Sequence, residues 1–276
     1  MSIQTSTSPP TSRDVREYIS PSRLNLWLKC PLAFRLRYID GMEQPTTSAQ
    51  LVGTVTHAGL EFYYRHRQMG VTVAEEEIAG YLVESWNRAA EESQITFADK
   101  TQAESLQRQI GSLVAAYLDH LPADEPPPLA VETRLTVPLI DPESGADLGM
   151  PLLGIVDLIL DDPDGPLVCD FKTAARGGVP LEIMNEIQLS SYAWLLRQSH
   201  GQIESAIEIR QLIKTKTPRV EFHRYEARQE KHFSRLFAIL RAYLDDLDRG
   251  EFIPRPGFGC SMCPFAAGEC LAWSGR

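Results

Sequence analysis

Two neighbouring runs of the sequence read Pro151-Leu-Leu-Gly-Ile-Val-Asp-Leu-Ile-Leu160 and Leu167-Val-Cys-Asp-Phe-Lys-Thr173. Both have the length and the apolar, β-branched content of buried strands. The first carries one acid, Asp157, and the second carries an acid and a base, Asp170 and Lys172. Burying two carboxylates and an ammonium among apolar side chains is costly unless the charges pair with one another or bind a cation.

The link between the two runs, Asp161-Asp-Pro-Asp-Gly-Pro166, is rich in turn-forming residues and predicts a hairpin. Such a hairpin would bring Asp157 beside Asp170. Because side chains alternate along a strand, Asp170 and Lys172 are expected on one face and Phe171 on the other. Two carboxylates and a lysine at the rim of a sheet can hold a divalent metal and a water beside a phosphate.

The oxygen ligands of Asp157 and Asp170 suit Mg²⁺ or Mn²⁺ better than zinc. A metal held there would polarise a phosphodiester and lower the pKa of a bound water. Lys172 would orient that water or stabilise charge on the phosphate oxygens. The structural alternative is an ion-paired cluster in which Lys172 only neutralises the two acids.

These residues also carry a resemblance to a known family. Gly154-Ile-Val-Asp157 followed by Asp170-Phe-Lys172 resembles the signature of the PD-(D/E)xK nucleases, and specifically of their RecB-like branch. The resemblance spans roughly residues 20 to 270. Further elements of that branch occur in the expected order: Cys30, Gly53-Thr-Val-Thr-His57, Gln188-Leu-Ser-Ser-Tyr192, and Cys260-Ser-Met-Cys263 with Cys270.

The resemblance implies roles for several of these residues. It adds His57 and the backbone carbonyl of Phe171 to Asp157 and Asp170 as metal ligands, and histidine ligation makes Mn²⁺ a plausible activator. It also implies that Gln188 and Tyr192, which share one helix face, steady the active site and the DNA strand. For Tyr192 this role is compatible with packing in the core.

Glu132, in Val131-Glu-Thr-Arg134, is a further candidate acid. It could join the metal site, directly or through water, or it could be an exposed acid on an edge strand. The sequence leaves both possibilities open.

Five cysteines form a second pattern. Cys260 and Cys263 have the spacing that presents two thiolates to one ion, Cys270 can curl back to them, and Cys30 is the candidate fourth ligand. Four thiolates suit zinc or an iron-sulfur cluster. The resemblance, to nucleases of the AddB type and the CRISPR-adaptation type, implies a structural [4Fe-4S] cluster, although the last spacing is one residue longer than expected. Cys169 is predicted to be a buried core thiol.

Composition sets the broad class. The chain has 276 residues, of which 43% are hydrophobic and 23% charged, as expected of a globular protein with one or two domains. We expect no membrane span, no secretory signal and a cytoplasmic location. The net charge of −10 argues against non-specific coating of duplex DNA. Local basic clusters at Arg35–Arg37, Arg65–Arg67 and Lys214–Arg219 could still line a channel.

The expected fold is mixed α/β, a restriction-endonuclease-like αβββαβ core with added helices before it. Residues 1–19 are expected to be a disordered tail, 20–99 a helical segment with Cys30 and His57, 100–250 the nuclease core, and 251–276 a Cys-rich tail. Helices are predicted near 21–39 with a break at 30–31, and at 51–68, 73–93, 100–120, 181–199 and 229–248. Strands are predicted at 130–139, 150–160, 166–173, 205–214 and 219–225.

The sequence therefore predicts a Mg²⁺- or Mn²⁺-dependent deoxyribonuclease with an iron-sulfur cluster. The resemblance favours an exonuclease on single-stranded DNA ends, with Tyr63, Tyr64 or Trp27 as stacking residues. Recombination, repair, phage DNA metabolism and CRISPR adaptation are the expected settings, with a helicase, recombinase or integrase as a possible partner in trans. The sequence contains no Gly-x4-Gly-Lys-Ser/Thr phosphate loop, so we expect no ATP-driven helicase in the chain itself. The alternative is a non-catalytic DNA-end binding module with a structural metal site made of four cysteines.

Overall fold

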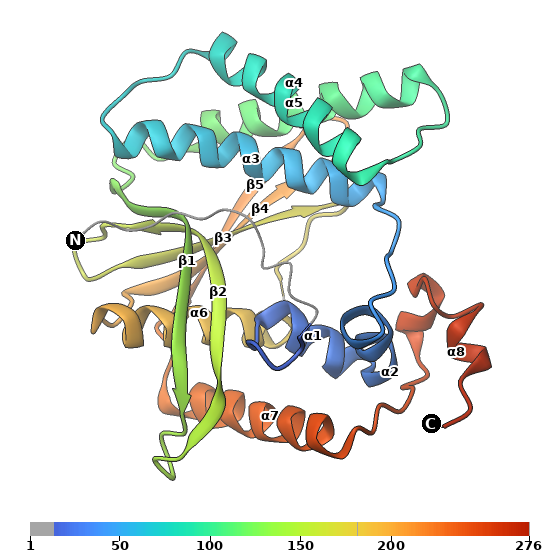
Figure 1. Ribbon diagram of the computed structural model, residues 1–276. Coiled ribbons are helices and arrows are strands. Elements are labelled where there is room, and N and C mark those ends of the chain that lie inside the picture. Colours follow the sequence, from blue (N-terminus) through green and yellow to red (C-terminus); the bar gives the residue numbers. More distant parts are fainter. Residues whose placement is uncertain (1–13, 181, 276) are drawn as a thin grey trace.

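The computed structural model describes residues 14–180 and 182–275, and Figure 1 shows a mixed sheet between two layers of helices. The strands lie side by side in chain order, and only β3 and β4 run parallel. They are β1 (Pro128–Ile140), β2 (Asp147–Leu160), β3 (Leu167–Ala174), β4 (Ala206–Ile213) and β5 (Arg219–Glu226).

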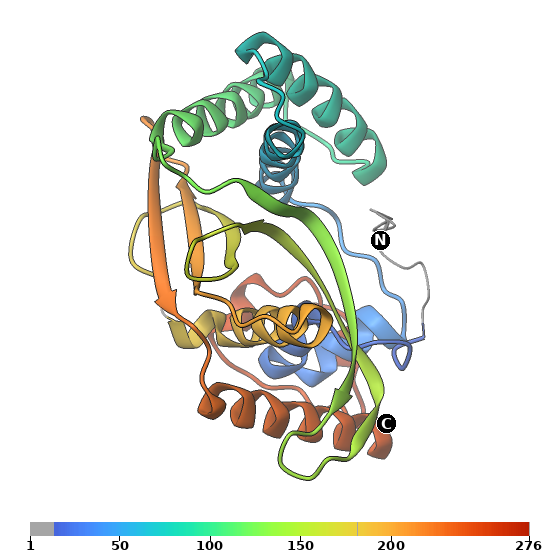
Figure 2. The same cartoon turned by 90° about the vertical axis from the view of Figure 1, so that its left-hand side faces the viewer.

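The helices divide between the two faces of the sheet (Figures 1 and 2). One face carries α3 (Ser48–Gln68), α4 (Glu75–Ser93) and α5 (Lys100–His120). The other carries α1 (Pro21–Lys29), α6 (Glu182–His200) and α7 (Glu230–Arg249). Short elements at the chain ends are α2 (Pro31–Phe34), the π-helix η1 (Arg35–Ile39), the 3₁₀ helix η2 (Phe258–Met262) and α8 (Glu269–Ala272).

The order from α5 onward is helix, three strands, helix, strand, which is the predicted αβββαβ arrangement. The predicted break near Cys30 is present, because Cys30 has an extended backbone and Pro31 starts a new helix. Among the described residues, no helix combines the length and apolar composition needed to span a bilayer.

The predicted disordered tail, residues 1–19, extends too far along the chain. Residues 1–13 lie outside the described part of the chain, but residues 14–19 belong to the fold. Ile19 is fully buried, its N–H donates to the carbonyl of Pro151 at 2.8 Å, and its carbonyl accepts from the N–H of Leu153 at 2.8 Å. An apolar side chain and two backbone hydrogen bonds hold this segment against β2.

Two apolar cores flank the sheet. The core we call the α6 core contains Val156 and Ile159 of β2, and the core we call the α3 core contains Leu158 and Leu160. In a regular strand, residues two apart face the same side. Val156 and Leu158 instead face opposite cores. The regular alternation of side chains along β2 is therefore interrupted at the residue between them, Asp157.

The alternation of side chains along β1 is interrupted at the position opposite Asp157. Val131 belongs to the α3 core and Leu135 to the α6 core, and the register sets Glu132 opposite Asp157. Glu132 has a φ of 45°, which is rare for a residue with a side chain. The hairpin of β1 and β2 therefore bends as one unit and curves away from β3, as Figure 2 shows.

The bend opens a fork in the sheet. Strands β2 and β3 pair only at Leu158 with Cys169, at residue 159 with 168, and at residue 160 with 167. Beyond Cys169, β3 continues beside β4 alone. We call this place, where β2 leaves β3, the fork.

Gly154 fits the bent hairpin against α6. A Cβ at this position would lie 2.5 Å from Cδ1 of Leu195 and 3.3 Å from Cε1 of Tyr192, and both residues are buried. The glycine of the Gly154-Ile-Val-Asp157 motif thus permits a close approach of strand and helix.

Gly154→Ala is expected to lower the free energy of unfolding by about 1–3 kcal/mol, because the added methyl group overpacks the contact with α6. Urea unfolding measures the change. The matched control is Gly80→Ala in α4, where a Cβ meets nothing within 4 Å, and which should stabilise by about 0.5–1 kcal/mol. Equal effects of the two substitutions would contradict the close approach.

Candidate active site

The fork leaves one backbone donor of β3 without a strand partner. The N–H of Phe171, just beyond the last β2–β3 pair, donates instead to Oδ2 of Asp157 at 2.7 Å. Asp157 is buried, so this hydrogen bond fixes its carboxylate across the opening. The predicted hairpin and the predicted proximity of Asp157 and Asp170 are both confirmed by this geometry.

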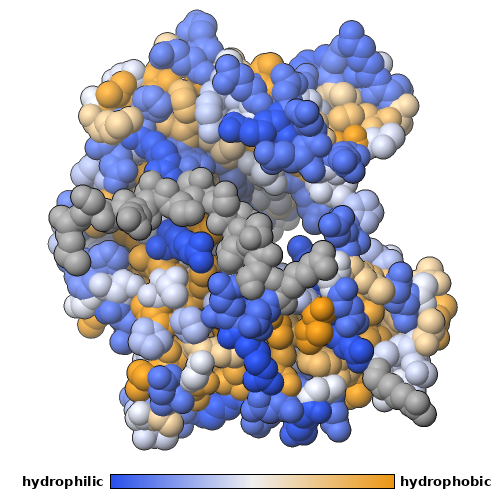
Figure 3. Space-filling model, viewed as in Figure 1, coloured by the Kyte–Doolittle hydropathy of each residue, from blue (hydrophilic) through white to orange (hydrophobic). Residues whose placement is uncertain are grey.

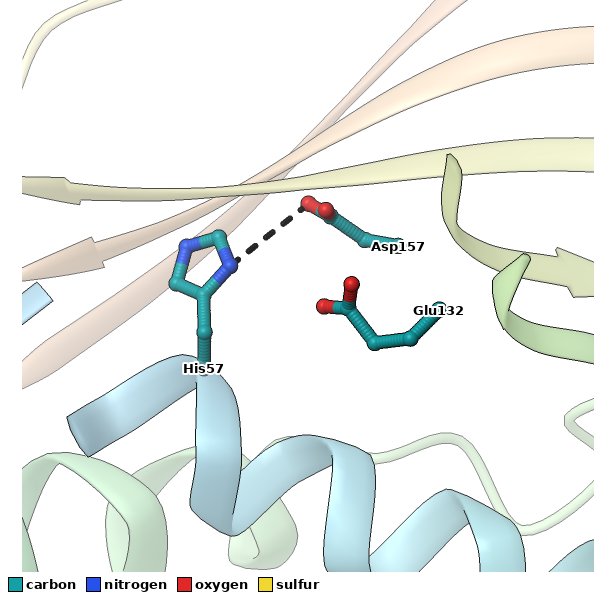
Figure 4. A group of neighbouring side chains, drawn as sticks. All are labelled: His57, Glu132 and Asp157. Atoms are coloured by element: carbon teal, nitrogen blue, oxygen red, sulfur yellow. Dashed lines mark ion pairs between the residues drawn. The ribbon is translucent and has the colours of Figure 1, made fainter. Parts of the chain in front are cut away.

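His57 reaches the fork from helix α3. Thr47 caps this helix with a reciprocal capping box to Gln50, which sets where the helix begins. Nδ1 of His57 lies 3.8 Å from Oδ2 of Asp157, and its ring meets the ring of Phe171 edge-on with centroids 5.9 Å apart. Figure 4 shows the imidazole pointing from the helix toward the two acids.

One group of potential metal ligands stands out among the described residues. His57, Glu132 and Asp157 each offer one ligand atom, and these atoms lie within 4.8 Å of one another. Figure 4 shows both carboxylates turned toward the imidazole. The left-handed backbone at Glu132 accompanies the bend that brings its side chain here. Strained backbone of this kind concentrates at functional sites.

The carboxylates at the fork are crowded. Burial, followed by the charges of Asp157 and Glu61, raises the pKa of Glu132 to about 8. Burial also raises the pKa of Asp170 to about 6, against the opposing charge of Lys172. A cation among these acids would relieve both the burial cost and the repulsion.

Asp170 lies at the same fork but is held from the α6 side. Its Oδ1 accepts hydrogen bonds from Nζ of Lys172 at 2.9 Å and from Nε2 of Gln188 at 2.8 Å. Nζ of Lys172 also donates to Oε1 of Gln188 at 2.9 Å, and Nε2 of Gln188 donates to Oη of Tyr192 at 2.8 Å. As predicted, Asp170 and Lys172 share a face, whereas Cys169 and Phe171 belong to the α3 core.

The donor set fits a hard divalent cation. It offers two carboxylates and an imidazole, and Asp170 adds an oxygen with unused capacity. Oδ2 of Asp170 is buried and lies 2.7 Å from Nζ of Lys172, yet it accepts no well-aligned hydrogen bond. Asp170 is not part of the close group of His57, Glu132 and Asp157. The predicted ligation by Asp170 and by the carbonyl of Phe171 stays a prediction.

A buried polar cluster supports α3, and sequence reasoning missed it. Tyr64, seven residues after His57, hydrogen-bonds Tyr117 at 2.6 Å and Glu125 at 2.9 Å, and it accepts from Arg210 of β4 at 2.8 Å. Arg210 also pairs with Glu125 and Glu208. Because positions seven apart share a helix face, this cluster sets the rotation of α3 that aims His57 at the fork. Its sequence signal was available: Glu208 and Arg210 alternate within an apolar strand, as Asp170 and Lys172 do.

Some predicted nucleic-acid contacts are wrong. Tyr64 is fully buried and Trp27 is 4% exposed, with its indole N–H donating to Asp246, so neither can stack on a base. In the predicted basic cluster at 65–67, Arg65 pairs with Glu61 and Arg67 pairs with Glu125. These arginines hold the fold together. The face in Figure 3 is nevertheless hollowed between the α3–α4 helices and the α1–α2 segment, with hydrophilic side chains on its rim.

The prediction that Cys169 is a buried core thiol is confirmed. Cys169 is fully buried, and burial raises the pKa of its thiol to about 12, as expected of a core thiol. Cys30, Cys263 and Cys270 contact one small apolar cluster built on Leu32, Ala33, Leu36 and Phe265. No three cysteine sulfurs of the described chain lie within 4.8 Å of one another.

Comparisons with known proteins identify the family of this chain. Residues 18–267 match the profile of the PD-(D/E)XK nuclease superfamily, and the chain therefore belongs to that superfamily, whose members use divalent metals and act on DNA. A search of curated proteins gives no match.

Solved structures with similarity to this chain include the following two. One is a protein of Eubacterium rectale provisionally named an exonuclease, with 14% sequence identity, a TM-score of 0.61, and coverage of 96% of this chain and 93% of that one. The other is SSO0001, with 17% identity, a TM-score of 0.36, and coverage of 88% and 93%. The first of these shares the fold of this chain.

Glu132→Gln is expected to change how the stability of the metal-free protein depends on pH. The pKa of Glu132 is raised from 4.5 to about 8, so between these values the native state holds a proton that the unfolded chain has lost. Stability therefore declines as the pH rises through this window. The glutamine variant should decline less, as measured by thermal unfolding in EDTA. Parallel declines for both proteins would contradict the crowded acid cluster.

Proposed function

We propose that this nuclease is a metal-dependent deoxyribonuclease of the RecB-like branch that acts as an exonuclease on single-stranded DNA ends. The observation that carries the proposal is the fork. It brings His57, Glu132 and Asp157 together as one potential ligand group and places Asp170 and Lys172 beside them.

The residues of the fork divide the work of hydrolysis. His57, Glu132 and Asp157 would hold Mg²⁺ or Mn²⁺, with Asp170 at the rim, and the cation would polarise the phosphodiester and acidify a water. Lys172, fixed by Asp170 and Gln188, presents its ammonium to the attacking water or to the phosphate oxygens. Gln188 and Tyr192 hold this lysine in place, because Gln188 bonds both Asp170 and Tyr192.

The structural [4Fe-4S] cluster is the second part of the proposal, with Cys30, Cys260, Cys263 and Cys270 as its ligands. Backbone N–H groups already point at two of these sulfurs, from Arg255 to Cys30 at 3.5 Å and from Gly257 to Cys260 at 3.4 Å. Such donors are a usual feature of cluster thiolates.

The preference for a [4Fe-4S] cluster over zinc rests on the resemblance to cluster-containing nucleases, since four thiolates suit either metal group. A metal group held by these four cysteines would join the α1–α2 segment to the end of the chain.

Lys172→Ala is expected to reduce cleavage of end-labelled single-stranded DNA at least about 100-fold, because the developing negative charge loses its ammonium partner. The assay compares Mn²⁺, Mg²⁺ and EDTA, and the ladder from each labelled end gives the polarity. Lys100→Ala on the exposed start of α5 is the matched control. Full activity of the Lys172 variant, or equal activity in EDTA, would refute the proposed chemistry.

An iron-sulfur cluster would make the anaerobically purified protein brown. Cys260→Ala is expected to remove this colour and to lower the melting temperature, with a smaller effect on cleavage at the fork. The cluster closes a loop of most of the chain, so its loss frees the chain ends. Cys169→Ala is the control that should keep the colour. A colourless wild-type protein that contains zinc would instead establish the zinc alternative.

A further inference from the structure

A pocket adjoins the fork, and the proposed chemistry uses only one of its walls. It has a volume of about 340 Å³, within the range of small-ligand pockets. It lies where the start of α1 meets the β1–β2 hairpin and α6. Gln188 and Tyr192, which hold Lys172 and Asp170, form one of its walls.

The lining of this pocket favours an anion. It contains Arg134 and the polar side chains of Ser22 and Asn25, and none of the described residues that line it is an acid. That absence is informative in a chain with a net charge of −10. Arg134 is exposed, and within the described chain it forms no hydrogen bond or ion pair. Its five donors are therefore available to a ligand.

Arg134 lies close to the potential metal ligands of the fork along strand β1. Arg134 pairs with Ile155 in the β1–β2 register, and it lies two residues beyond Glu132 on the same strand. Two residues of chain span at most about 7 Å even when fully extended, so with the bend at Glu132 the backbone of Arg134 lies within about one phosphate-to-phosphate step of the ligand group. The apolar wall, which includes Tyr18 and Ile155, can receive the sugar and base of one nucleotide.

We infer that this pocket is a nucleotide subsite, in which Arg134 binds the phosphate next to the one that is cleaved, assisted by Ser22 and Asn25. The inference rests on the proposed function, because it assigns the pocket to the same DNA strand. A guanidinium binds a phosphate through two parallel hydrogen bonds, which would fix the position of the strand relative to Lys172.

Arg134→Gln tests the subsite by binding rather than by cleavage. Binding of a short fluorescent single-stranded DNA is followed by anisotropy in EDTA over a range of salt concentrations. Loss of one phosphate contact should weaken binding about tenfold and reduce the slope of log Kd against log salt by about 0.7. Arg134→Lys should retain the slope and lose part of the affinity.

The matched control is Arg88→Gln on α4, an exposed arginine without an ion pair in the described chain, which removes the same charge far from the pocket. Equal affinity and slope for Arg134→Gln and Arg88→Gln would overturn the subsite. So would a wild-type protein that does not bind single-stranded DNA. Because the Arg134 side chain forms no hydrogen bond or ion pair within the described chain, both variants should melt at the same temperature as the wild-type protein.

A neutral methylphosphonate linkage, moved one position at a time along the strand, identifies the phosphate involved. At one position the methylphosphonate should weaken DNA binding by the wild-type protein and leave DNA binding by the Arg134→Gln variant unchanged. If removal of the terminal phosphate has this effect instead, the subsite holds a strand end. Sensitivity of both proteins to every position alike would overturn the inference.

The failure of the inference and that of the proposed function are distinguishable. Binding that depends on Arg134, without metal-dependent cleavage by the wild-type protein, keeps the subsite and refutes the nuclease activity. Metal-dependent cleavage by the wild-type protein, together with binding that does not change in Arg134→Gln, supports the nuclease activity and refutes the subsite.

Discussion

The hydrogen bond from the N–H of Phe171 to the carboxylate of Asp157 is the interaction on which the site depends. It exists because β2 stops pairing with β3 after Leu158 and Cys169, and a buried N–H must find another acceptor. The acceptor it finds is a candidate metal ligand. The same bend that parts the strands also turns Glu132 toward Asp157. A break in an otherwise regular sheet thus produces both the opening and the residues that line it.

The two helical layers complete the fork from opposite faces, which is why neither layer alone could form the site. Helix α3 supplies His57, and the buried contacts of Tyr64 with Glu125 and Arg210 hold that helix in its rotation. Helix α6 supplies the Gln188 amide that holds Lys172 against Asp170, and it can approach because residue 154 is a glycine. The Lys172 ammonium and the Asp170 carboxylate offset part of each other's burial cost by pairing. The crowding of the acids around Glu132 is not offset in this way, and a bound cation would relieve it.

Much of this arrangement follows from local pattern. Strand alternation was enough to place Asp170 and Lys172 on one face and Cys169 on the other, and turn-forming residues were enough to predict the hairpin. The left-handed backbone at Glu132 was beyond prediction, because it arises from the bending of two paired strands rather than from any residue preference. The burial of Tyr64 was missed for a similar reason. Its partners Glu125 and Arg210 lie 61 and 146 positions away in the chain, and only the assembled sheet brings them together.

The central claim is that the fork is a divalent-cation site. The most direct test is a crystal structure of the protein soaked in Mn²⁺, with an anomalous difference map recorded at the manganese edge. The account predicts a peak between the imidazole of His57 and the carboxylates of Glu132 and Asp157, which is absent from crystals of Asp157→Asn. A map without a peak at the fork, or with manganese bound only elsewhere, would contradict it.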